Sequence, residues 1–412
     1  MNLHLKKSTC NLQSEIAITG SKSETNRLLL LQALYPNLEI QNTSKSDDSE
    51  VMQAALKNLQ SSRRNSQLID IHHAGTAMRF LTAFFAIQNH KETILTGSAR
   101  MHERPIKILV DALVQLGAKI EYLQNSGFPP LKISGTEITA SKVTLNANVS
   151  SQYISALLLI APKLKNGLEL LLEGEITSVP YLKMTLELLN QIGIETTFED
   201  NRITVNSKPK ITNSKLTIES DWSSASYWYS IVALSEVGTK ITLSSYKKNS
   251  LQGDAALAEI YKNFGVETLF NNDNSITISK ISTDKIATLN LTLNNAPDIA
   301  QTIAVTSFGL GIECNLYGLH TLKIKETDRL EALKTELSKL GATISVTDNS
   351  LHLKATTFIN QNISIATYQD HRMAMAFAPL ALKVPIIIEN AMVVSKSYPT
   401  FWDDLMKSGF DF

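Results

Sequence analysis

Four segments of the chain share one change of pattern, from apolar residues at helical spacing to apolar residues that alternate after a glycine. Glycine is common just past the C-terminus of a helix, and alternation is typical of a half-buried strand. We therefore predict a helix, a glycine and a strand in each of LVQLGAKIEY (113–122), LLNQIGIETTF (188–198), IYKNFGVETLF (260–270) and LSKLGATISV (337–346).

The spacing of these segments is nearly constant. Their glycines recur at intervals of 76, 72 and 76 residues and are Gly117, Gly193, Gly265 and Gly341. Such a period indicates a duplicated α/β unit, and the chain has room for about six copies. The runs 152–161 and 225–235 are apolar on almost every side. We therefore expect the helices to lie inside and the sheets outside.

The composition excludes several classes of protein. With 39 basic and 39 acidic residues, the 412-residue chain has no formal net charge. This argues against a nucleic-acid binder or a membrane-surface protein, because both need an excess of positive charge. The two cysteines, Cys10 and Cys314, lie far apart, so we expect a reduced, cytoplasmic location. We find no apolar segment that suits a signal peptide or a membrane-spanning helix.

Motifs for common cofactors are missing from the sequence. GSKS (20–23) lacks the first glycine and the Gly-Lys pair of a P-loop, and Gly309 and Gly311 have no third glycine after them. His72 and His73 are adjacent and have no HExxH or CxxC motif beside them, so a metal site is not expected. We predict neither a cofactor nor a metal.

The segment GSKSETNR (20–27) combines a helix start with an unusually placed cation. Ser21 and Glu24 fit the S-x-x-E capping box. Lys22 lies at the mouth of the same helix, where the helix dipole disfavours a cation unless an anion binds there too. Taken alone, the segment fits both a plain capped helix and an anion site.

Two later segments also place cations unfavourably. In IKETDRLEAL (324–333), Lys325 and Arg329 are four residues apart, which puts two like charges on one face of a predicted helix. In YQDHRMAMAF (368–377), Asp370 fits an N-cap and Arg372 follows in the first turn, the end at which the dipole disfavours a cation. Each arrangement has an ordinary explanation as a solvated or locally paired charge.

Together, the polar segments supply seven cations, which are Lys22, Arg27, Arg104, Lys325, Arg329, Arg372 and Lys396. A small substrate that carries phosphate and carboxylate groups would account for such a set, since arginine binds both groups in a bidentate way. Asp298 and Glu326 are then candidates for acid–base catalysis, although N-capping explains Asp298 equally well.

Ten motifs in these segments occur in the order found in one enzyme family. They are GSKSxxNR, AGTAMR, RMxERP, VSSQ, SVPY (178–181), SSASY (223–227), NSxQGD (249–254), PDxAxT, KETDR and DHRMAM. In this respect the chain, from about residue 20 to about residue 400, resembles the 5-enolpyruvylshikimate-3-phosphate synthase family of enolpyruvyl transferases.

The resemblance implies a two-domain inside-out α/β barrel of six βαβαββ-type units, with helices inside and sheets outside. One domain would comprise residues 1–19 and 221–412, and the other residues 20–220. The implied reaction transfers the enolpyruvyl group of phosphoenolpyruvate to the 5-hydroxyl of shikimate 3-phosphate by addition and elimination, as a step of aromatic amino acid biosynthesis. The implied enzyme is a monomer that binds these two anions and neither nucleic acid nor membrane.

Carried over by motif, the resemblance also implies roles for individual residues. The shikimate 3-phosphate site would comprise Lys22, Ser23, Arg27, Ser150, Ser151, Gln152, Ser178, Asp298 and Lys325. The phosphoenolpyruvate site would comprise Lys22, Gly75, Arg104, Gln152, Arg329, Arg372 and Lys396. Asp298 resembles the proton acceptor and Glu326 the proton donor, with Lys22 as an additional acid–base candidate.

The chain departs from the family at two positions. Many members have Gly-Asn before AGTAMR, where this chain has His72-His73, and many have asparagine at the position of Thr321. Either change can alter substrate affinity. Two other functions are alternatives, namely the related UDP-N-acetylglucosamine enolpyruvyl transferase and a repeat scaffold without catalysis. The first typically carries a catalytic cysteine that neither cysteine here matches, and the second has no need of Asp298 and Glu326 beside seven cations.

Overall fold

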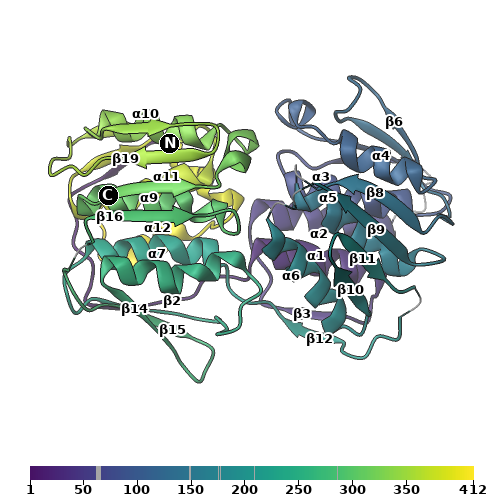
Figure 1. The fold of residues 1–412 in the computed structure, drawn as a ribbon, viewed down its shortest axis with the longest axis horizontal. Helices are drawn as coiled ribbons and strands as arrows, with labels where there is room; N and C mark the ends of the chain where they lie inside the picture. The colour runs from purple at the N-terminus through teal and green to yellow at the C-terminus, as the bar shows by residue number, and fades with distance from the viewer. Residues whose placement is uncertain (62–65, 148–149, 175, 177, 208, 285) are drawn as a thin grey trace. The chain divides into compact units, whose positions relative to one another are not determined.

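The computed structural model describes residues 1–61, 66–147, 150–174, 176, 178–207, 209–284 and 286–412. The chain folds into two compact units (Figure 1). The discontinuous unit consists of Met1–Gly20 and Glu219–Phe412, and the continuous unit is Ser21–Ile218. Each unit has its own helices and sheets and is described separately below.

The continuous unit begins with a helix and ends with a strand. Its helices are α1 (Lys22–Leu34), α2 (Asp47–Ser61), α3 (Gly75–Ala86), η1 (Met101–Glu103), α4 (Lys107–Gln115), α5 (Ser151–Ile160), η2 (Ala161–Lys163) and α6 (Val179–Gln191). Its strands are β3 (Glu39–Gln41), β4 (Ser66–Asp70), β5 (Glu92–Thr96), β6 (Lys119–Tyr122), β7 (Leu131–Ser134), β8 (Lys142–Asn146), β9 (Leu168–Glu173), β10 (Thr196–Glu199), β11 (Arg202–Val205) and β12 (Lys215–Thr217).

The discontinuous unit contains both chain termini. Its helices are α7 (Trp222–Leu234), η3 (Gly253–Ala256), α8 (Leu257–Ile260), η4 (Tyr261–Phe264), η5 (Pro297–Ile299), α9 (Ala300–Leu310), η6 (His320–Ile324), α10 (Arg329–Lys339), α11 (His371–Phe377), η7 (Ala378–Leu382), η8 (Ala391–Lys396) and α12 (Phe401–Lys407). Its strands are β1 (Leu3–Leu5), β2 (Gln13–Ile16), β13 (Lys240–Leu243), β14 (Val266–Phe270), β15 (Ile276–Lys280), β16 (Thr288–Thr292), β17 (Glu313–Tyr317), β18 (Ile344–Val346), β19 (Ser350–Leu353), β20 (Ile363–Ile365) and β21 (Ile386–Ile388).

Four copies of one βαβαββ arrangement account for most of the strands. Each forms a four-stranded sheet in which the first two strands are parallel and an antiparallel hairpin follows. The orders are β4-β5-β7-β6, β8-β9-β11-β10, β2-β13-β15-β14 and β16-β17-β19-β18. The predicted glycines lie at the same place in every copy, between the second helix and the hairpin, with φ values of 105°, 92°, 71° and 99°. These left-handed conformations are the reason that glycine recurs there.

Two further copies are shorter. In one, β12 pairs in parallel with β3, and in the other β20 pairs in parallel with β21, whose second neighbour is the N-terminal strand β1. Neither contains the hairpin that the repeated glycine precedes, so the periodicity in the sequence reveals four copies where the fold has six. The six-unit prediction is thereby confirmed. In the described residues the strands form separate sheets and do not close into a barrel.

The β2-β13 pair shows how the chain passes between the units. Residues Gln13–Ile16 lie in parallel register with Lys240–Leu243, although the whole continuous unit separates them in sequence. The bridge Gly20↔Ser220 lies beside the two connections. One βαβαββ copy is therefore interrupted after its first strand and resumes at α7.

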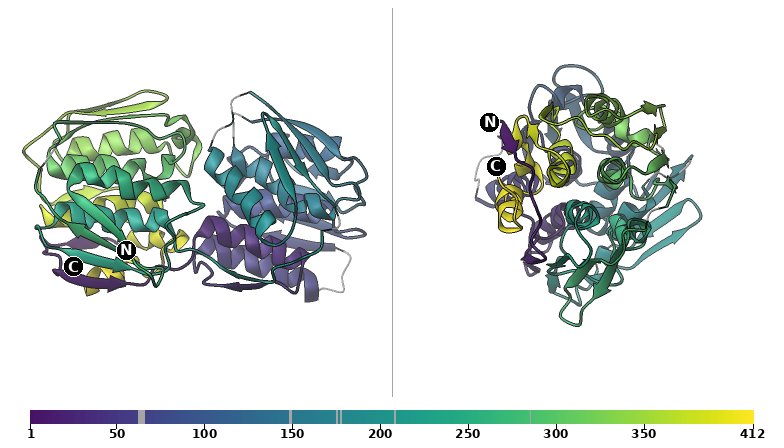
Figure 2. Two further views of the ribbon diagram at one scale, coloured as in Figure 1. Left: turned by 60° about the horizontal axis from the view of Figure 1, so that its bottom comes forward. Right: turned by 90° about the vertical axis from the view of Figure 1, so that its left-hand side faces the viewer.

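The helices lie inside and the sheets outside, as predicted. Every residue of α7 and of α11 is buried, and in α5 all residues but one are buried. The strands instead alternate, as β9 does, with one face buried and one partly exposed. The end-on view of the discontinuous unit shows its helices at the centre and its strands around them (Figure 2).

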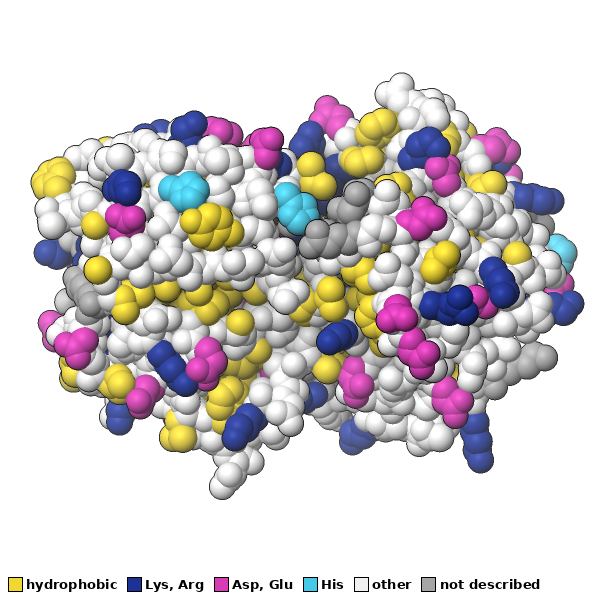
Figure 3. Space-filling view, in the orientation of Figure 1, with side chains coloured by type: hydrophobic (Ala, Val, Ile, Leu, Met, Phe, Trp, Pro, Cys, Tyr) yellow, Lys and Arg dark blue, Asp and Glu magenta, His cyan; other side chains and the backbone are white. Residues whose placement is uncertain are grey.

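The surface bears both signs of charge. On the face shown in Figure 3, basic and acidic side chains are interspersed over each unit, without a large patch of one sign. Among the described residues, no helix has the length and apolarity that crossing a bilayer requires.

Candidate active site

The topology places the N-termini of the helices at one end of each copy. Each crossover helix leaves the carboxyl end of one strand and returns to the start of the next, so its N-terminus lies at the carboxyl end of the parallel strands. In the discontinuous unit, Arg329 is the first residue of α10, Arg372 the second of α11 and Ser223 the second of α7. Asp298 lies in η5, immediately before α9.

Arg329 is buried at the centre of these helix ends. Its Nε donates to Asp370 Oδ2 (2.6 Å), its Nη1 to Asp298 Oδ1 (2.9 Å) and its Nη2 to Glu326 Oε2 (2.8 Å). Burial by itself lowers the pKa of this guanidinium, but the charges of the three carboxylates outweigh it and raise the pKa above its usual range. The guanidinium therefore fixes three acidic side chains from three separate segments.

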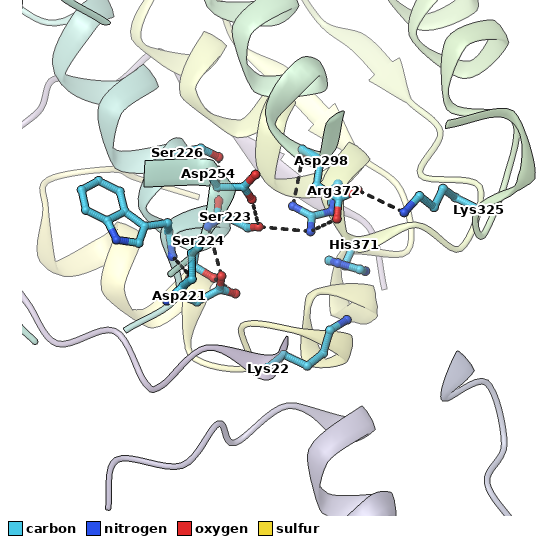
Figure 4. Close-up of polar contacts among 12 residues, drawn as sticks. Lys22, Asp221, Ser223, Ser224, Ser226, Asp254, Asp298, Lys325, His371 and Arg372 are labelled. Carbon is cyan, nitrogen blue, oxygen red and sulfur yellow. Dashed lines mark hydrogen bonds and ion pairs between the residues drawn. The ribbon is translucent and has the colours of Figure 1, made fainter. Parts of the chain in front are cut away.

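Asp298 in turn is held by three cations. Besides Arg329 Nη1, Arg372 Nη2 donates to Asp298 Oδ2 (3.2 Å) and Lys325 Nζ lies 3.5 Å from Asp298 Oδ1. Figure 4 shows Arg372 and Lys325 reaching Asp298 from different elements. N-capping does not explain Asp298, because the N-cap residue of α9 is Ile299. Asp298 is thus the shared partner of the predicted cations.

Lys325 and Arg329 do not lie on one helical face, which corrects the prediction from their spacing. The helix α10 begins only at Arg329, because Asp328 caps it and accepts hydrogen bonds from Leu330 N and Glu331 N. Lys325 instead follows η6, as its C-cap residue. The two side chains meet through Asp298, so it is the carboxylate and not a helix that offsets their repulsion.

Arg372 connects Asp298 to a second buried carboxylate. Its Nη2 donates to Ser223 Oγ (3.3 Å), and the Ser223 hydroxyl donates to Asp254. Figure 4 shows Ser223 between Arg372 and Asp254. Burial, followed by the charge of Asp298, raises the pKa of Asp254 to about 7.

Lys396 lies at the edge of the same group. Its Nζ donates to the carbonyl oxygen of Gln369 (2.7 Å), in the turn that leads into Asp370 and α11. Tyr368 and Gln369 in this turn have φ values of 53° and 57°, a conformation that is rare for residues other than glycine. The predicted phosphoenolpyruvate ligands of this unit, Arg329, Arg372 and Lys396, are thus joined through the segment 368–372.

In the continuous unit, Arg27 is buried and its described hydrogen bonds go to hydroxyl and carbonyl groups. It donates to Thr185 Oγ1 (2.7 Å), Ser155 Oγ (3.0 Å) and the carbonyl oxygens of Ser23 (2.8 Å) and Tyr181 (3.3 Å). Burial lowers the pKa of Arg27 to about 10, because the charges of Tyr181 and Glu24 offset only part of the cost of burial. A buried cation of this kind is stabilised by an approaching anion, whereas Arg329 already has its counter-charges.

Lys22 occupies the first position of α1, where the Ser21 hydroxyl accepts from Glu24 N. The capped helix start predicted for GSKSETNR is therefore confirmed. The ammonium group of Lys22 lies 3.6 Å from Asp48 Oδ2, in the first turn of α2. Lys22 is partly exposed, with 20% of its side chain accessible, and so remains accessible to a ligand.

Gly75, Arg104 and Gln152 lie around the N-terminal turn of α3. A Cβ atom on Gly75 would overlap the Arg104 guanidinium, so a larger residue there would displace this side chain from the position that it occupies. Gln152, in α5, donates to Thr76 Oγ1 (3.2 Å). Arg79 is buried here too, and burial followed by the charge of Arg104 lowers its pKa to about 10.

The predicted serines lie at helix N-termini of the same unit. Ser150 caps α5 through Gln152 N, and Ser151 is the first residue of that helix. Ser178 precedes α6 with a left-handed φ of 55°, and the Ser23 carbonyl oxygen holds Arg27. Ser150 therefore caps α5, whereas Ser151 lies in its first turn.

Several residues of these clusters were not predicted. Asp370 was interpreted only as an N-cap, which it is, but it also binds Arg329. Asp48, Ser223 and Asp254 were given no role, although Ser223 and Asp254 belong to motifs quoted above. Thr321, one of the two departures, has a buried hydroxyl without a hydrogen-bond partner in the described residues. No group of three His, Cys, Asp or Glu side chains that could hold a metal ion occurs in the described ranges.

Comparison with known proteins decides the family. The family model of EPSP synthase (3-phosphoshikimate 1-carboxyvinyltransferase) matches residues 6–405. The chain belongs to the EPSP synthase family.

Relatives of the EPSP synthase family match over nearly their whole length. A 3-phosphoshikimate 1-carboxyvinyltransferase from Bacteroides fragilis is 46% identical over 99% of this chain and 98% of its own. One from Actinobacillus pleuropneumoniae is 33% identical over 96% of each chain. The predicted resemblance is thereby confirmed, and the chain is an enzyme of this family.

Solved structures bear on the fold of this EPSP synthase family member. An EPSP synthase from Acinetobacter baumannii covers 100% of the chain with a TM-score of 0.80 at 18% identity. An enolpyruvyl transferase from Streptomyces tendae covers 100% of it with a TM-score of 0.72 at 13% identity. These likenesses confirm the predicted inside-out α/β fold. The assignment of individual site residues stays a prediction.

Replacing Arg329 by lysine tests the carboxylate cluster. One ammonium group cannot reach Asp370, Asp298 and Glu326 together, so buried carboxylates lose their partner. We expect Arg329→Lys to lower the free energy of unfolding by about 3–5 kcal/mol, measured by urea denaturation. The control is Lys334→Ala in the same helix, whose exposed pair with Glu331 should contribute less than about 1 kcal/mol. Equal losses in the two variants would contradict the assignment.

The raised pKa of Asp254 predicts a dependence of stability on pH. The carboxyl group keeps its proton up to about pH 7 in the folded protein but loses it near 3.8 when unfolded. The free energy of unfolding should therefore fall as the pH rises from about 4 to about 7, by a few kcal/mol.

Asp254→Asn removes this titration. Urea denaturation at about pH 4.5 and about pH 7.5 should show the variant gaining stability relative to the wild type at the higher pH. The same stability difference at both pH values would show that the carboxyl group does not titrate in this range.

Proposed function

We propose a division of roles for the reaction that family membership assigns to this enzyme. It transfers the enolpyruvyl group of phosphoenolpyruvate to the 5-hydroxyl of shikimate 3-phosphate and releases phosphate. In the addition step, the 5-hydroxyl oxygen attacks C2 of phosphoenolpyruvate, Asp298 accepts the hydroxyl proton and Glu326, in its protonated form, donates a proton to the methylene carbon. In the elimination step, the new methyl group returns a proton to the Glu326 carboxylate, the C–O bond to phosphate breaks, and phosphate leaves.

The observation that carries these roles is the pairing of Asp298 and Glu326 on one guanidinium. Nη1 and Nη2 of Arg329 hold one oxygen of each carboxylate, at 2.9 and 2.8 Å. A single rigid group thus orients the proposed acceptor and the proposed donor, which is the geometric requirement for transferring two protons in one step. Glu326 is 27% exposed and Asp298 13% exposed, so both are partly accessible.

The cations bind the anionic groups of the two substrates in this proposal. We assign shikimate 3-phosphate to Lys22, Ser23, Arg27, Ser150, Ser151, Gln152, Ser178, Asp298 and Lys325. We assign phosphoenolpyruvate to Lys22, Gly75, Arg104, Gln152, Arg329, Arg372 and Lys396, and we keep Lys22 as an additional acid–base group. The hydroxyl and carbonyl partners of Arg27 and the proximity of Arg79 to Arg104 support these assignments, since no carboxylate accepts a hydrogen bond from Arg27 or Arg79 among the described contacts.

We also propose domain boundaries at residues 19/20 and 220/221, a monomeric state and a cytoplasmic location. The division of the chain after Gly20 and before Glu219 supports the boundaries. Each unit encloses its own buried helices, which fits a monomer, and the two cysteines are free, which fits a reducing compartment.

Phosphate release from phosphoenolpyruvate tests the choice of acceptor. We expect release with shikimate 3-phosphate and none with UDP-N-acetylglucosamine or without an acceptor, because the predicted site provides hydroxyl and cationic ligands for a compact phosphate ester. Release with UDP-N-acetylglucosamine alone would favour the related transferase, and no release with either would contradict the proposed reaction.

The role of Asp298 is tested by Asp298→Asn. The amide keeps the size of the side chain and an oxygen acceptor for Arg329, but it cannot take a proton. We expect kcat to fall by about 10²–10⁴-fold while the dissociation constants of the substrates change much less, as measured by calorimetry. Normal turnover would remove Asp298 from the role of proton acceptor.

A further inference from the structure

His73 lies at an acidic pair beside the predicted substrate ligand Lys22. It belongs to the turn between β4 and α3, and 36% of its side chain is exposed. Its Nε2 lies 3.9 Å from Asp47 Oδ2 and 3.9 Å from Asp48 Oδ1, both in the first turn of α2. The imidazole therefore faces two carboxylates, and its protonation would place a full positive charge next to them.

One of these carboxylates is shared with Lys22. Oδ1 of Asp48 faces His73, and Oδ2 lies 3.6 Å from the Lys22 ammonium. Only 9% of the Asp48 side chain is exposed, so water screens the two contacts weakly. When His73 is neutral, Lys22 is the one cation paired with Asp48 among the described residues. When His73 is protonated, its imidazolium and the Lys22 ammonium both face the carboxylate of Asp48.

Two other charged groups lie near the turn. His72, the preceding residue, lies 3.8 Å from Asp70 through its Nδ1, and the two side chains are 67% and 49% exposed. Arg104 lies against Gly75, two residues after His73. Neither His72 nor Arg104 forms an ion pair with Asp48 in the described part of the chain.

We propose that His73 is a residue that sets substrate affinity according to pH, by competing with Lys22 for Asp48. The protonated imidazole binds Asp47 and Asp48 and leaves the charge of Lys22 to the phosphate or carboxylate of the substrate. The neutral imidazole leaves Lys22 partly neutralised by Asp48. The proposal rests on the assignment of Lys22 to the substrate site, and histidine is the side chain whose charge changes most readily near neutral pH.

The consequence is a KM that rises with pH. As His73 loses its proton, the cationic charge available to the anion falls, so phosphoenolpyruvate and shikimate 3-phosphate bind more weakly. The phosphate groups of the substrates titrate near pH 6 as well. The effect of His73 must therefore be taken as the difference between the wild type and a variant without the imidazole.

The kinetic experiment compares His73→Asn with His72→Asn. KM for both substrates is measured from about pH 6 to about pH 9, and the wild-type KM should rise about fivefold more than that of His73→Asn. His72→Asn is the matched control, because residue 72 has a φ of 50°, which asparagine tolerates, and its partner Asp70 is exposed. Its KM should rise with pH by the same factor as that of the wild type.

A second readout does not depend on turnover. The titration midpoint of the His73 imidazole is followed by NMR in the wild type and in Asp48→Asn, each with and without phosphoenolpyruvate. We expect Asp48→Asn to lower the midpoint, and the anion to raise it in the wild type, since coupling between proton and ligand is reciprocal.

The two experiments separate failure of this proposal from failure of the proposed function. If the wild type turns over but its KM follows the same pH profile as that of His73→Asn, the proposal is wrong and the function stands. If the wild type does not turn over, the function is wrong, and the NMR midpoints still decide the competition. The proposed competition would be overturned if neither Asp48→Asn nor phosphoenolpyruvate changed the titration midpoint of His73.

Discussion

The placement of cations among helix N-termini is the constraint on which the rest of this structure depends. A helix N-terminus favours an anion, yet Lys22, Arg329 and Arg372 each lie in a first helical turn. The fold produces this conflict because its crossover helices all begin at the carboxyl ends of parallel strands. At these helix N-termini, the positive charge of the three side chains has to be balanced.

The two units balance the positive charge at their helix N-termini in different ways. In the discontinuous unit, three carboxylates surround Arg329, and Asp298 serves three cations at once. In the continuous unit, Arg27 is held by hydroxyl and carbonyl oxygens and its pKa is lowered to about 10. The first arrangement fixes the geometry of acidic side chains, whereas the second leaves an attraction for an incoming anion. The first arrangement suits the acid–base chemistry proposed above, and the second suits the proposed binding of anions.

Burying several charged groups close together is energetically unfavourable, and the raised pKa of Asp254 illustrates this. A buried carboxyl group near Asp298 would add a negative charge without water to solvate it, so its pKa rises to about 7. Ser223 then links it to Arg372. At Asp48, by contrast, a single carboxylate lies near two basic side chains, Lys22 and His73. Charges in these clusters are shared between segments, and a change at one residue alters its neighbours.

The sequence by itself determined the repeat, the layer order and the placement of Lys22 and Arg372 in first helical turns. The four glycines were visible because a left-handed C-terminal turn requires them, and the inner helices because burial removes their polar face. Only the tertiary structure decided which charges meet. The spacing of Lys325 and Arg329 wrongly predicted one helical face, and Asp48, Ser223 and Asp254 gave no periodic signal at all. Their partners come from other segments, up to 149 residues away for Arg372 and Ser223, and a pairing across such a distance is set by packing and leaves no local pattern in the chain.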